Sequence, residues 1–383
     1  MTGRERLLSI LSRRPPDRVA WTTLVDDTTR SAMPARVREM PVLDFYRHIG
    51  CDILQFGNYG LPRDLCVPSP ARLVTPPIET EWRTEADGLA VRTQKTPWGT
   101  LVATFRNGHP IKHPVESLAE LRTLKSLWAE SHYDEADGSE AAYARADAAI
   151  GDQGLYIPTL DPSPVQQLIE MDMGMASFYY LLQDHRDEVE ELLAAMHACR
   201  MQEYEIVARR SSAPALMPVE NTSTTLISPA LYRRHSLPQI RDFCRICHRH
   251  GKKAILHMCG LLKGLLPELA ETGLDGINAL TPPPVGDLPF EAALDALGDG
   301  LIILGGILDP AVFQKPHVTR NELWHALDRL FSPRLRKAPF LLWLGADGLP
   351  TPLDRFLAVR DWVNNRGGYM ERHDCESIGP ANR

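Results

Sequence analysis

The segment His257-Met258-Cys259-Gly260 has the spacing most typical of chemistry in this chain. It directly follows the apolar run 253–256, which has the composition of a buried strand. Because side chains alternate along an extended strand, His257 and Cys259 project from the same face. Imidazole nitrogen and thiolate sulfur are ligands that zinc prefers, and a catalytic zinc takes three protein ligands. The spacing predicts a metal site; the alternative is that both side chains only pack or bond the backbone.

The elements that must position this segment alternate regularly along the chain. Short apolar runs alternate with helical patterns, and two further apolar runs precede them, which gives eight strands. The runs are 19–25, 52–56, 155–160, 215–219, 253–256, 276–280, 301–304 and 340–344, and the helical patterns are 163–185, 186–209, 229–250, 261–272, 290–297, 319–331 and 353–365. Eight strands alternating with helices predict an α/β protein with a (β/α)₈ TIM barrel.

The stretch 79–107 interrupts this alternation of strands and helices. Its residues alternate between polar and apolar, and Asp87-Gly88 and Pro97-Trp98-Gly99 separate the runs. We interpret it as a small antiparallel β meander inserted after the second strand. The expected organisation is therefore a single barrel over 1–366, with 79–107 inserted in it, followed by a polar C-terminal tail at 367–383.

In a barrel of this kind the active site lies at the carboxyl ends of the strands. Polar residues that directly follow the apolar runs are therefore the candidates for chemistry. They include Asp26, Asn58, Asp161, Glu220, Asn221, His257, Cys259 and Asp347. Among them Asp26, Asp161 and Asp347 are the catalytic candidates, and Asn58 and Asn221 are candidates for binding a substrate. Gly306 joins the binding candidates because a glycine lets a substrate approach the backbone closely.

Composition limits the classes of function. The 383 residues carry 42 Lys plus Arg against 49 Asp plus Glu, a formal charge of −7, which disfavours a nucleic-acid partner. No apolar run approaches the roughly 18 residues of a membrane helix, and the first residues lack the apolar core of a signal peptide. Seven scattered cysteines do not suit a disulfide framework. We therefore expect a cytoplasmic protein with no membrane partner.

Three segments together resemble the uroporphyrinogen decarboxylase superfamily. They are the opening Thr2-Gly-Arg-Glu-Arg-Leu-Leu-Ser-Ile-Leu with Pro15-Pro-Asp-Arg-Val19, Ser163-Pro-Val-Gln-Gln-Leu-Ile-Glu with Leu181-Leu-Gln-Asp-His185, and Gly251-Lys-Lys-Ala-Ile-Leu-His-Met-Cys-Gly260. The resemblance spans roughly 2–363 and is closest to the cobalamin-dependent methyltransferase branch. It implies a TIM barrel, a zinc ion, and a cobalamin (corrinoid) cofactor that a separate corrinoid protein carries.

Two departures from the family pattern bear on the chemistry. True decarboxylases of the family have an Arg-rich motif after the first strand that pairs with the substrate's carboxylates, whereas this chain has Leu24-Val-Asp-Asp-Thr-Thr-Arg30. The thiol-methylating members resemble one another in a His, Cys, Cys ligand set, and Ala346 stands where the second Cys is expected. Glu220, at the end of the neighbouring strand, is the best substitute ligand beside His257 and Cys259. Asp347 is the second choice.

The resulting functional hypothesis is a methyltransferase. It would move a methyl group between a small methylated substrate (O-, N- or S-methyl) or a thiol and the cobalt of the partner corrinoid protein, with or without the assistance of zinc. One alternative is a decarboxylase of a smaller acid, in which Asp26 or Asp161 protonates the carbanion. The other is a metal-free barrel that only binds a ligand. The methyl donor, the acceptor and the oligomeric state, including a homodimer, are left open.

Overall fold

The structure is a computed structural model that describes residues 1–85, 88–315 and 317–368. Contacts divide the chain into two compact units, which are described separately. Unit 1 contains 1–54, 150–155 and the described residues from 302 onward, and unit 2 contains 55–149 and 156–301. From residue 369 onward the predicted polar tail lies outside the described residues. In the described ranges no helix has both the length and the apolar character needed to cross a membrane.

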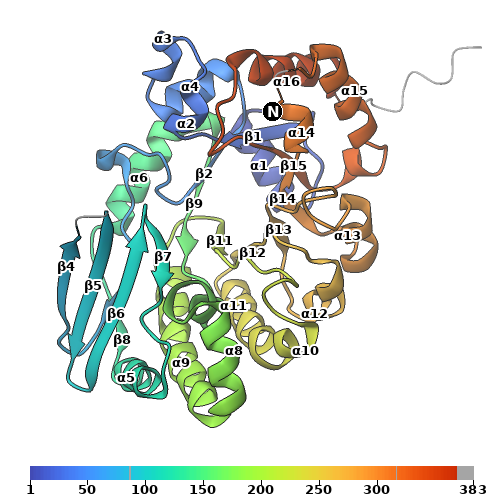
Figure 1. The fold of residues 1–383 in the computed structure, drawn as a ribbon. Helices are drawn as coiled ribbons and strands as arrows, with labels where there is room; N and C mark the ends of the chain where they lie inside the picture. The colour runs from blue at the N-terminus through green and yellow to red at the C-terminus, as the bar shows by residue number, and fades with distance from the viewer. Residues whose placement is uncertain (86–87, 316, 369–383) are drawn as a thin grey trace, which may run out of the picture. The chain divides into compact units, whose positions relative to one another are not determined.

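Unit 1 is built on a parallel sheet in which β15 lies between β14 and β1 (Figure 1). The strands are β1 (Ala20–Leu24), β14 (Ile302–Ile307) and β15 (Phe340–Gly345). Around them are α1 (Gly3–Leu11), α2 (Asp27–Arg30), α3 (Ala35–Arg38), α4 (Val42–Ile49), η2 (Gly151–Gln153), α14 (Pro310–Phe313), α15 (Arg320–Leu330), η6 (Leu335–Lys337) and α16 (Leu353–Arg366). Edge-on contacts of Phe356 with Phe45 and Phe313 join α4, α14 and α16 in its core.

Unit 2 contains a second run of parallel strands, in the order β10, β11, β12 and β13 (Figure 1). They are β10 (Thr159–Leu160), β11 (Ala215–Pro218), β12 (Lys253–His257) and β13 (Gly276–Asn278). The helical segments are η1 (Arg63–Leu65), α5 (Leu118–Ala129), α6 (Ser139–Ile150), α7 (Pro164–Gln167), η3 (Leu168–Asp172), α8 (Gly174–Asp184), α9 (Arg186–Arg210), α10 (Pro229–Leu231), η4 (Tyr232–Ser236), α11 (Leu237–Arg249), η5 (Lys263–Leu265), α12 (Leu266–Ala270) and α13 (Phe290–Leu297). The paired strands β2 (Ile53–Phe56) and β9 (Gly154–Ile157) run from unit 1 into unit 2.

The predicted α/β class with parallel strands is confirmed, and every predicted apolar run contains a strand. The strands are buried because helices follow them and cover the apolar side chains. Two predicted helices are interrupted. The pattern 163–185 contains the π-helical turn η3, and the pattern 229–250 contains the π-helical turn η4. After η4, Pro238 at the start of α11 cannot donate the backbone hydrogen bond of a continuous helix.

The predicted small antiparallel sheet is confirmed and is larger than expected (Figure 1). Its strands are β4 (Glu79–Thr84), β5 (Leu89–Thr96), β6 (Gly99–Arg106) and β7 (His109–Lys112), so β7 extends it beyond residue 107. The apolar side chains Leu101 and Ala103 of β6 are buried, and α5 packs against this strand. A second antiparallel pair, β3 (Ala71–Val74) with β8 (His132–Glu135), was not predicted.

We expect the outer edge of the antiparallel sheet to contribute little to stability. Every residue of β4 is exposed, and Trp82 is 59% exposed, whereas Leu101 is 3% exposed. Trp82→Thr should change the free energy of unfolding by less than about 1 kcal/mol, and Leu101→Ala should lower it by about 2 to 4 kcal/mol. Shortening the β4–β5 turn should likewise spare folding. Urea denaturation checks these values, and global unfolding of the trimmed protein would contradict the assignment.

Candidate functional site

The carboxyl ends of β10, β11 and β12 bring polar side chains together in unit 2. Parallel pairing in register places Leu160 beside Pro218 and Val219 beside His257. The residues that follow these strands therefore lie at one edge of the sheet. They are Asp161 and Ser163 after β10, Glu220 and Asn221 after β11, and Cys259 after β12, with His257 as the last residue of β12.

His257 is oriented by the neighbouring strand. Its Nδ1 lies 2.6 Å from Oδ1 of Asn278, the last residue of β13, and Asn278 is fully buried. An amide oxygen only accepts hydrogen bonds, so Nδ1 carries the proton and donates it. The basic nitrogen of the neutral ring is therefore Nε2. This nitrogen is the one that could accept a proton or bind a metal.

Cys259 is exposed and is linked to the end of β11 through Asn221. The Cys259 thiol donates to Oδ1 of Asn221 over 3.5 Å, and Nδ2 of Asn221 donates to Glu170 over 3.5 Å. The Asn221 backbone is left-handed, with φ of 41°, and its N–H donates to the carbonyl of His257. A side chain at Gly260 would lie 2.4 Å from the Thr222 carbonyl oxygen, so the residue after Cys259 must be glycine.

Glu220 lies beneath this surface with its carboxylate held by Ser163. The carboxylate accepts the backbone N–H of Ser163 over 2.6 Å and its hydroxyl over 2.9 Å, and the residue is 1% exposed. Burial raises the pKa of Glu220 to about 7, against the hydrogen bonds from Ser163 that favour the ionised form. Glu220 thus ties the N-terminus of α7 to the end of β11.

Asp161 lies at the outer rim of the same edge. Its side chain is 64% exposed, and it pairs with Nη2 of the buried Arg200 over 3.3 Å. Arg200 also donates to Glu203 and to Gln167, each over 2.6 Å. The sequence offered no signal for Arg200, which lies 39 residues away in the long helix α9. Asn278 and Glu170 were missed for a similar reason, because only the fold brings them to the site.

A three-ligand zinc site is not assembled at this edge. Across the described ranges no group of three or more His, Cys, Asp and Glu side chains could hold a metal ion. His257 and Cys259 have the right chemistry and lie at one strand end, but the proposed third ligand, Glu220, is hydrogen-bonded to Ser163. Two side chains, His257 and Cys259, are therefore suitable zinc ligands. A third ligand would be available only if the Glu220 carboxylate broke its hydrogen bonds with Ser163.

Three predicted site residues belong to unit 1. Asp26 is the N-cap of α2 and accepts hydrogen bonds from the N–H groups of Thr29, over 2.7 Å, and Gly348, over 3.0 Å. Although burial favours its neutral form, these bonds lower the pKa of Asp26. Asp347 is exposed after β15. Gly306 is buried at a register shift in β14.

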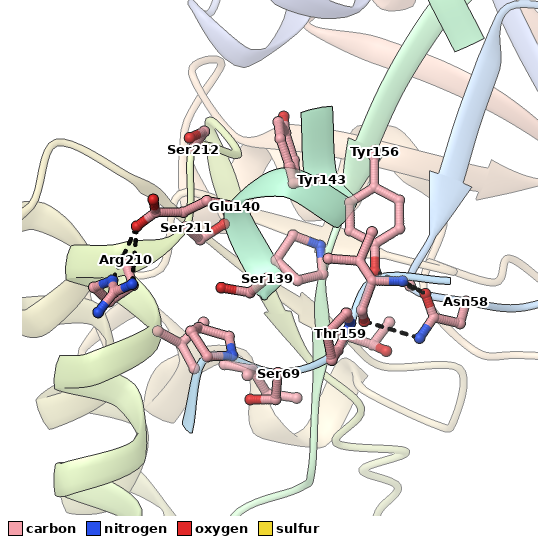
Figure 2. A pocket seen from close by; sticks show the side chains of 17 residues that line it. Asn58, Ser69, Ser139, Glu140, Tyr143, Tyr156, Thr159, Arg210, Ser211 and Ser212 are labelled. Atoms are coloured by element: carbon pink, nitrogen blue, oxygen red, sulfur yellow. Dashed lines mark hydrogen bonds and ion pairs between the residues drawn. The ribbon is translucent and has the colours of Figure 1, made fainter. Parts of the chain in front are cut away.

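Asn58 lines a pocket of unit 2 that includes none of the strand-end residues described above (Figure 2). Its amide group donates to the Val67 carbonyl over 3.0 Å and accepts the Val67 N–H over 2.8 Å, which closes the loop after β2. The Tyr156 hydroxyl also donates to its Oδ1 over 3.2 Å. The pocket has a volume of about 210 Å³. Asn58 therefore lines a pocket to which His257 and Cys259 do not belong.

A parallel α/β fold with His, Cys, Asn and acidic side chains at its strand ends defines an enzyme-like fold and site. The family model of uroporphyrinogen decarboxylase matches residues 165–365, more than half of the chain. The chain belongs to the uroporphyrinogen decarboxylase family. The predicted family is thereby confirmed, and the matched region contains Glu220, Asn221, His257 and Cys259 of the strand-end site.

Comparison with solved structures supports the fold. A methyltransferase from Methanosarcina mazei is similar over 95% of this chain and 98% of its own, with a TM-score of 0.54 and 14% sequence identity. At this identity the similarity concerns the fold. Dispersin B covers 91% of this chain and 99% of its own at 11% identity, with a TM-score of 0.34, too low to carry an argument. No curated protein matches the sequence.

Proposed function

We propose that this protein is a methyltransferase that moves a methyl group between a small methylated compound or thiol and the cobalt of a separate corrinoid protein. In this proposal the parallel strands belong to a closed (β/α)₈ barrel, and the partner presents its corrinoid to the strand-end edge. Family membership and the similarity in fold to an archaeal methyltransferase support it. The observation that carries it is that His257 and Cys259 both lie at the carboxyl end of β12.

The charges at the strand ends favour methyl transfer over decarboxylation of a polyacid. A polycarboxylate requires cations, but the segment after β1 contains Asp26, whose lowered pKa keeps it ionised at neutral pH. A decarboxylase of a smaller acid would need a proton donor near the substrate. Asp26 is occupied as a helix cap and Asp161 is paired with Arg200, so neither is suited to that role.

The residues of the chain have separate roles in this proposal. For a thiol acceptor, the S–C bond forms as the Co–C bond breaks, and the thiol proton must leave. We assign Nε2 of His257 as the base that takes it. Asn278 holds the ring in the required tautomer, and Asn221 holds the Cys259 side chain at the edge. For a methylated donor the same nitrogen, once protonated, would protonate the leaving heteroatom.

Zinc remains part of the proposal as a bound ion. With zinc bound, His257 and Cys259 would hold it, with Glu220 as third ligand once it leaves Ser163; Nε2 of His257 would then be a zinc ligand and not the base. When bound, zinc would lower the pKa of a thiol substrate or polarise a leaving heteroatom.

The proposal is tested by following the corrinoid spectrum. The purified protein is mixed with methylcob(III)alamin and small thiols, or with cob(I)alamin and methyl ethers, methylamines and methyl thioethers. We expect protein-dependent conversion between the methylated and reduced forms with at least one compound. Uroporphyrinogen serves as the competing substrate. Its decarboxylation, with no change in the corrinoid spectrum, would replace the proposal with the decarboxylase hypothesis.

We expect the purified protein to contain at most one zinc per chain. Because His257 and Cys259 share a strand end, Cys259→Ser should lower the zinc content by more than about tenfold. Cys66→Ser is the matched control, since Cys66 is also partly accessible and lies outside the strand-end site. Elemental analysis measures the content. A Cys259→Ser protein with full zinc content would show that the ligand assignment is wrong.

A further inference from the structure

The pocket that contains Asn58 has no role in the proposed reaction. Its walls come from five segments of unit 2: the loops after β2 and before β3, the start of α6, strands β9 and β10, and the end of α9 (Figure 2). Proline, valine and leucine side chains and the rings of Tyr143 and Tyr156 make much of the wall apolar. The two rings meet edge to face, with centroids 5.8 Å apart and planes at 89°.

One buried polar group in this pocket lacks a hydrogen-bond partner among the described residues. Ser139, the first residue of α6, is 5% exposed, and its hydroxyl oxygen forms no hydrogen bond within the described residues. Two other serines of the lining do have hydrogen-bond partners. Ser69 accepts the Ala71 N–H over 3.1 Å, and Ser211 accepts the Ala213 N–H over 3.2 Å. A buried hydroxyl without a partner is unfavourable, so a ligand that pairs with Ser139 would relieve that cost.

The pocket carries no net charge to offer a ligand. Arg210 is its only lining cation among the described residues, and Nε of Arg210 donates to Glu140, also in the lining, over 3.0 Å. A further carboxylate, Glu135, also pairs with this guanidinium. Burial raises the pKa of the Tyr156 hydroxyl, which therefore stays neutral. An ionised ligand would find no uncompensated opposite charge here.

We propose that this pocket binds a small uncharged aromatic molecule that carries a hydroxyl group, of the phenol class. The ring lies against the tyrosine and proline surfaces, and the ligand hydroxyl exchanges a hydrogen bond with Ser139. The site is distinct from the strand-end residues His257 and Cys259. This inference does not depend on the proposed methyl transfer.

Binding of phenol to the full chain tests the site by ligand-observed NMR titration. We expect phenol to bind with a dissociation constant of roughly 1 mM, as its few atoms allow. Ser139→Ala should weaken phenol binding roughly tenfold and leave toluene binding unchanged, because only phenol uses the hydroxyl. Ser212→Ala is the matched control, since Ser212 is an exposed lining residue. Benzoate, which is charged, should bind at least tenfold more weakly than phenol.

Several outcomes would overturn the proposal. They are no phenol binding to the wild-type protein, equal phenol binding to Ser139→Ala and wild type, or benzoate binding as tight as phenol. Because Ser139→Ala removes only a hydroxyl from the first turn of a helix, its unfolding midpoint should match that of the wild type. Tyr156→Trp, which enlarges a side chain of the wall, should weaken phenol and toluene alike. If phenol and toluene bound to Tyr156→Trp as they do to the wild type, their binding site would lie outside this pocket.

Discussion

Replacing His257 by alanine is expected to slow methyl transfer by about 100-fold or more while the protein stays folded. A positioned general base contributes about 10² to 10⁴ in rate, and Asn278 leaves Nε2 of His257 as the basic nitrogen. The side chain lies at the end of β12, outside the buried run Ala254–Leu256, so its loss should leave the protein folded. The buried Asn278 loses one hydrogen bond, which should lower the free energy of unfolding by about 1 to 3 kcal/mol. Single-turnover kinetics with methylcob(III)alamin and an active thiol measure the rate.

Two variants control for indirect effects of this change. His132→Ala removes an exposed imidazole from β8 and should keep full activity. Asn278→Ala should lower the rate less than His257→Ala does, because it removes only the hydrogen bond that orients the His257 ring. If His257→Ala kept more than about a tenth of the wild-type rate, the assignment of this residue as the base would be wrong. An increase in KM with unchanged kcat would assign it to binding.

The contribution of Glu220 to the stability of the metal-free protein is expected to fall as pH rises from about 4.5 to about 7. Glu220 is a buried acid whose pKa is raised to about 7 in the folded protein, against an ordinary value of 4.5. Between these two values the folded state binds more protons than the unfolded state, so raising the pH favours unfolding. Below about pH 4.5 the contribution of Glu220 to the free energy of unfolding is fully present, and above about pH 7 it is lost. Its size is about 3 kcal/mol at most.

Glu220→Gln isolates this contribution. The amide keeps the shape and can accept the Ser163 N–H, but it does not ionise. In the presence of a chelator, this variant should be as stable as wild type near pH 5 and more stable than wild type near pH 8. Glu130→Gln, at an exposed position, should reproduce the wild-type pH dependence. Urea denaturation at each pH measures the free energy of unfolding. An identical pH dependence of this free energy for Glu220→Gln and wild type would exclude Glu220 as the cause of the fall.

Much of the fold could be predicted from the sequence because its strands are buried. Runs such as 215–219 and 340–344 are continuous and apolar, as expected of strands covered on both faces. The pair β3 and β8 was missed because its strands are short and largely exposed, so no period-two pattern distinguishes them. The π-helical turns were missed because each is a single turn inside a longer helical pattern.

The candidate site could be predicted only in part. Strand-end position was enough to place Glu220, Asn221 and Cys259 at one edge of unit 2. It could not show that the carboxylate of Glu220 is held by Ser163, 57 residues earlier in the chain, because that depends on how α7 begins. Nor could it show that Asn58 faces a separate pocket, since the loop after β2 turns back through Val67.

The central claim is that this chain transfers methyl groups to or from a corrinoid, and a labelled methyl group tests it most directly. Methylcob(III)alamin carrying a ¹³C methyl group is incubated with the protein and the thiol or amine that responds in the spectral assay, and the product is analysed by mass spectrometry. We expect ¹³C methyl on the acceptor in amounts that rise with wild-type protein and fall at least about 100-fold with His257→Ala. Labelled product formed equally with and without the protein, or equally by the variant, would contradict it.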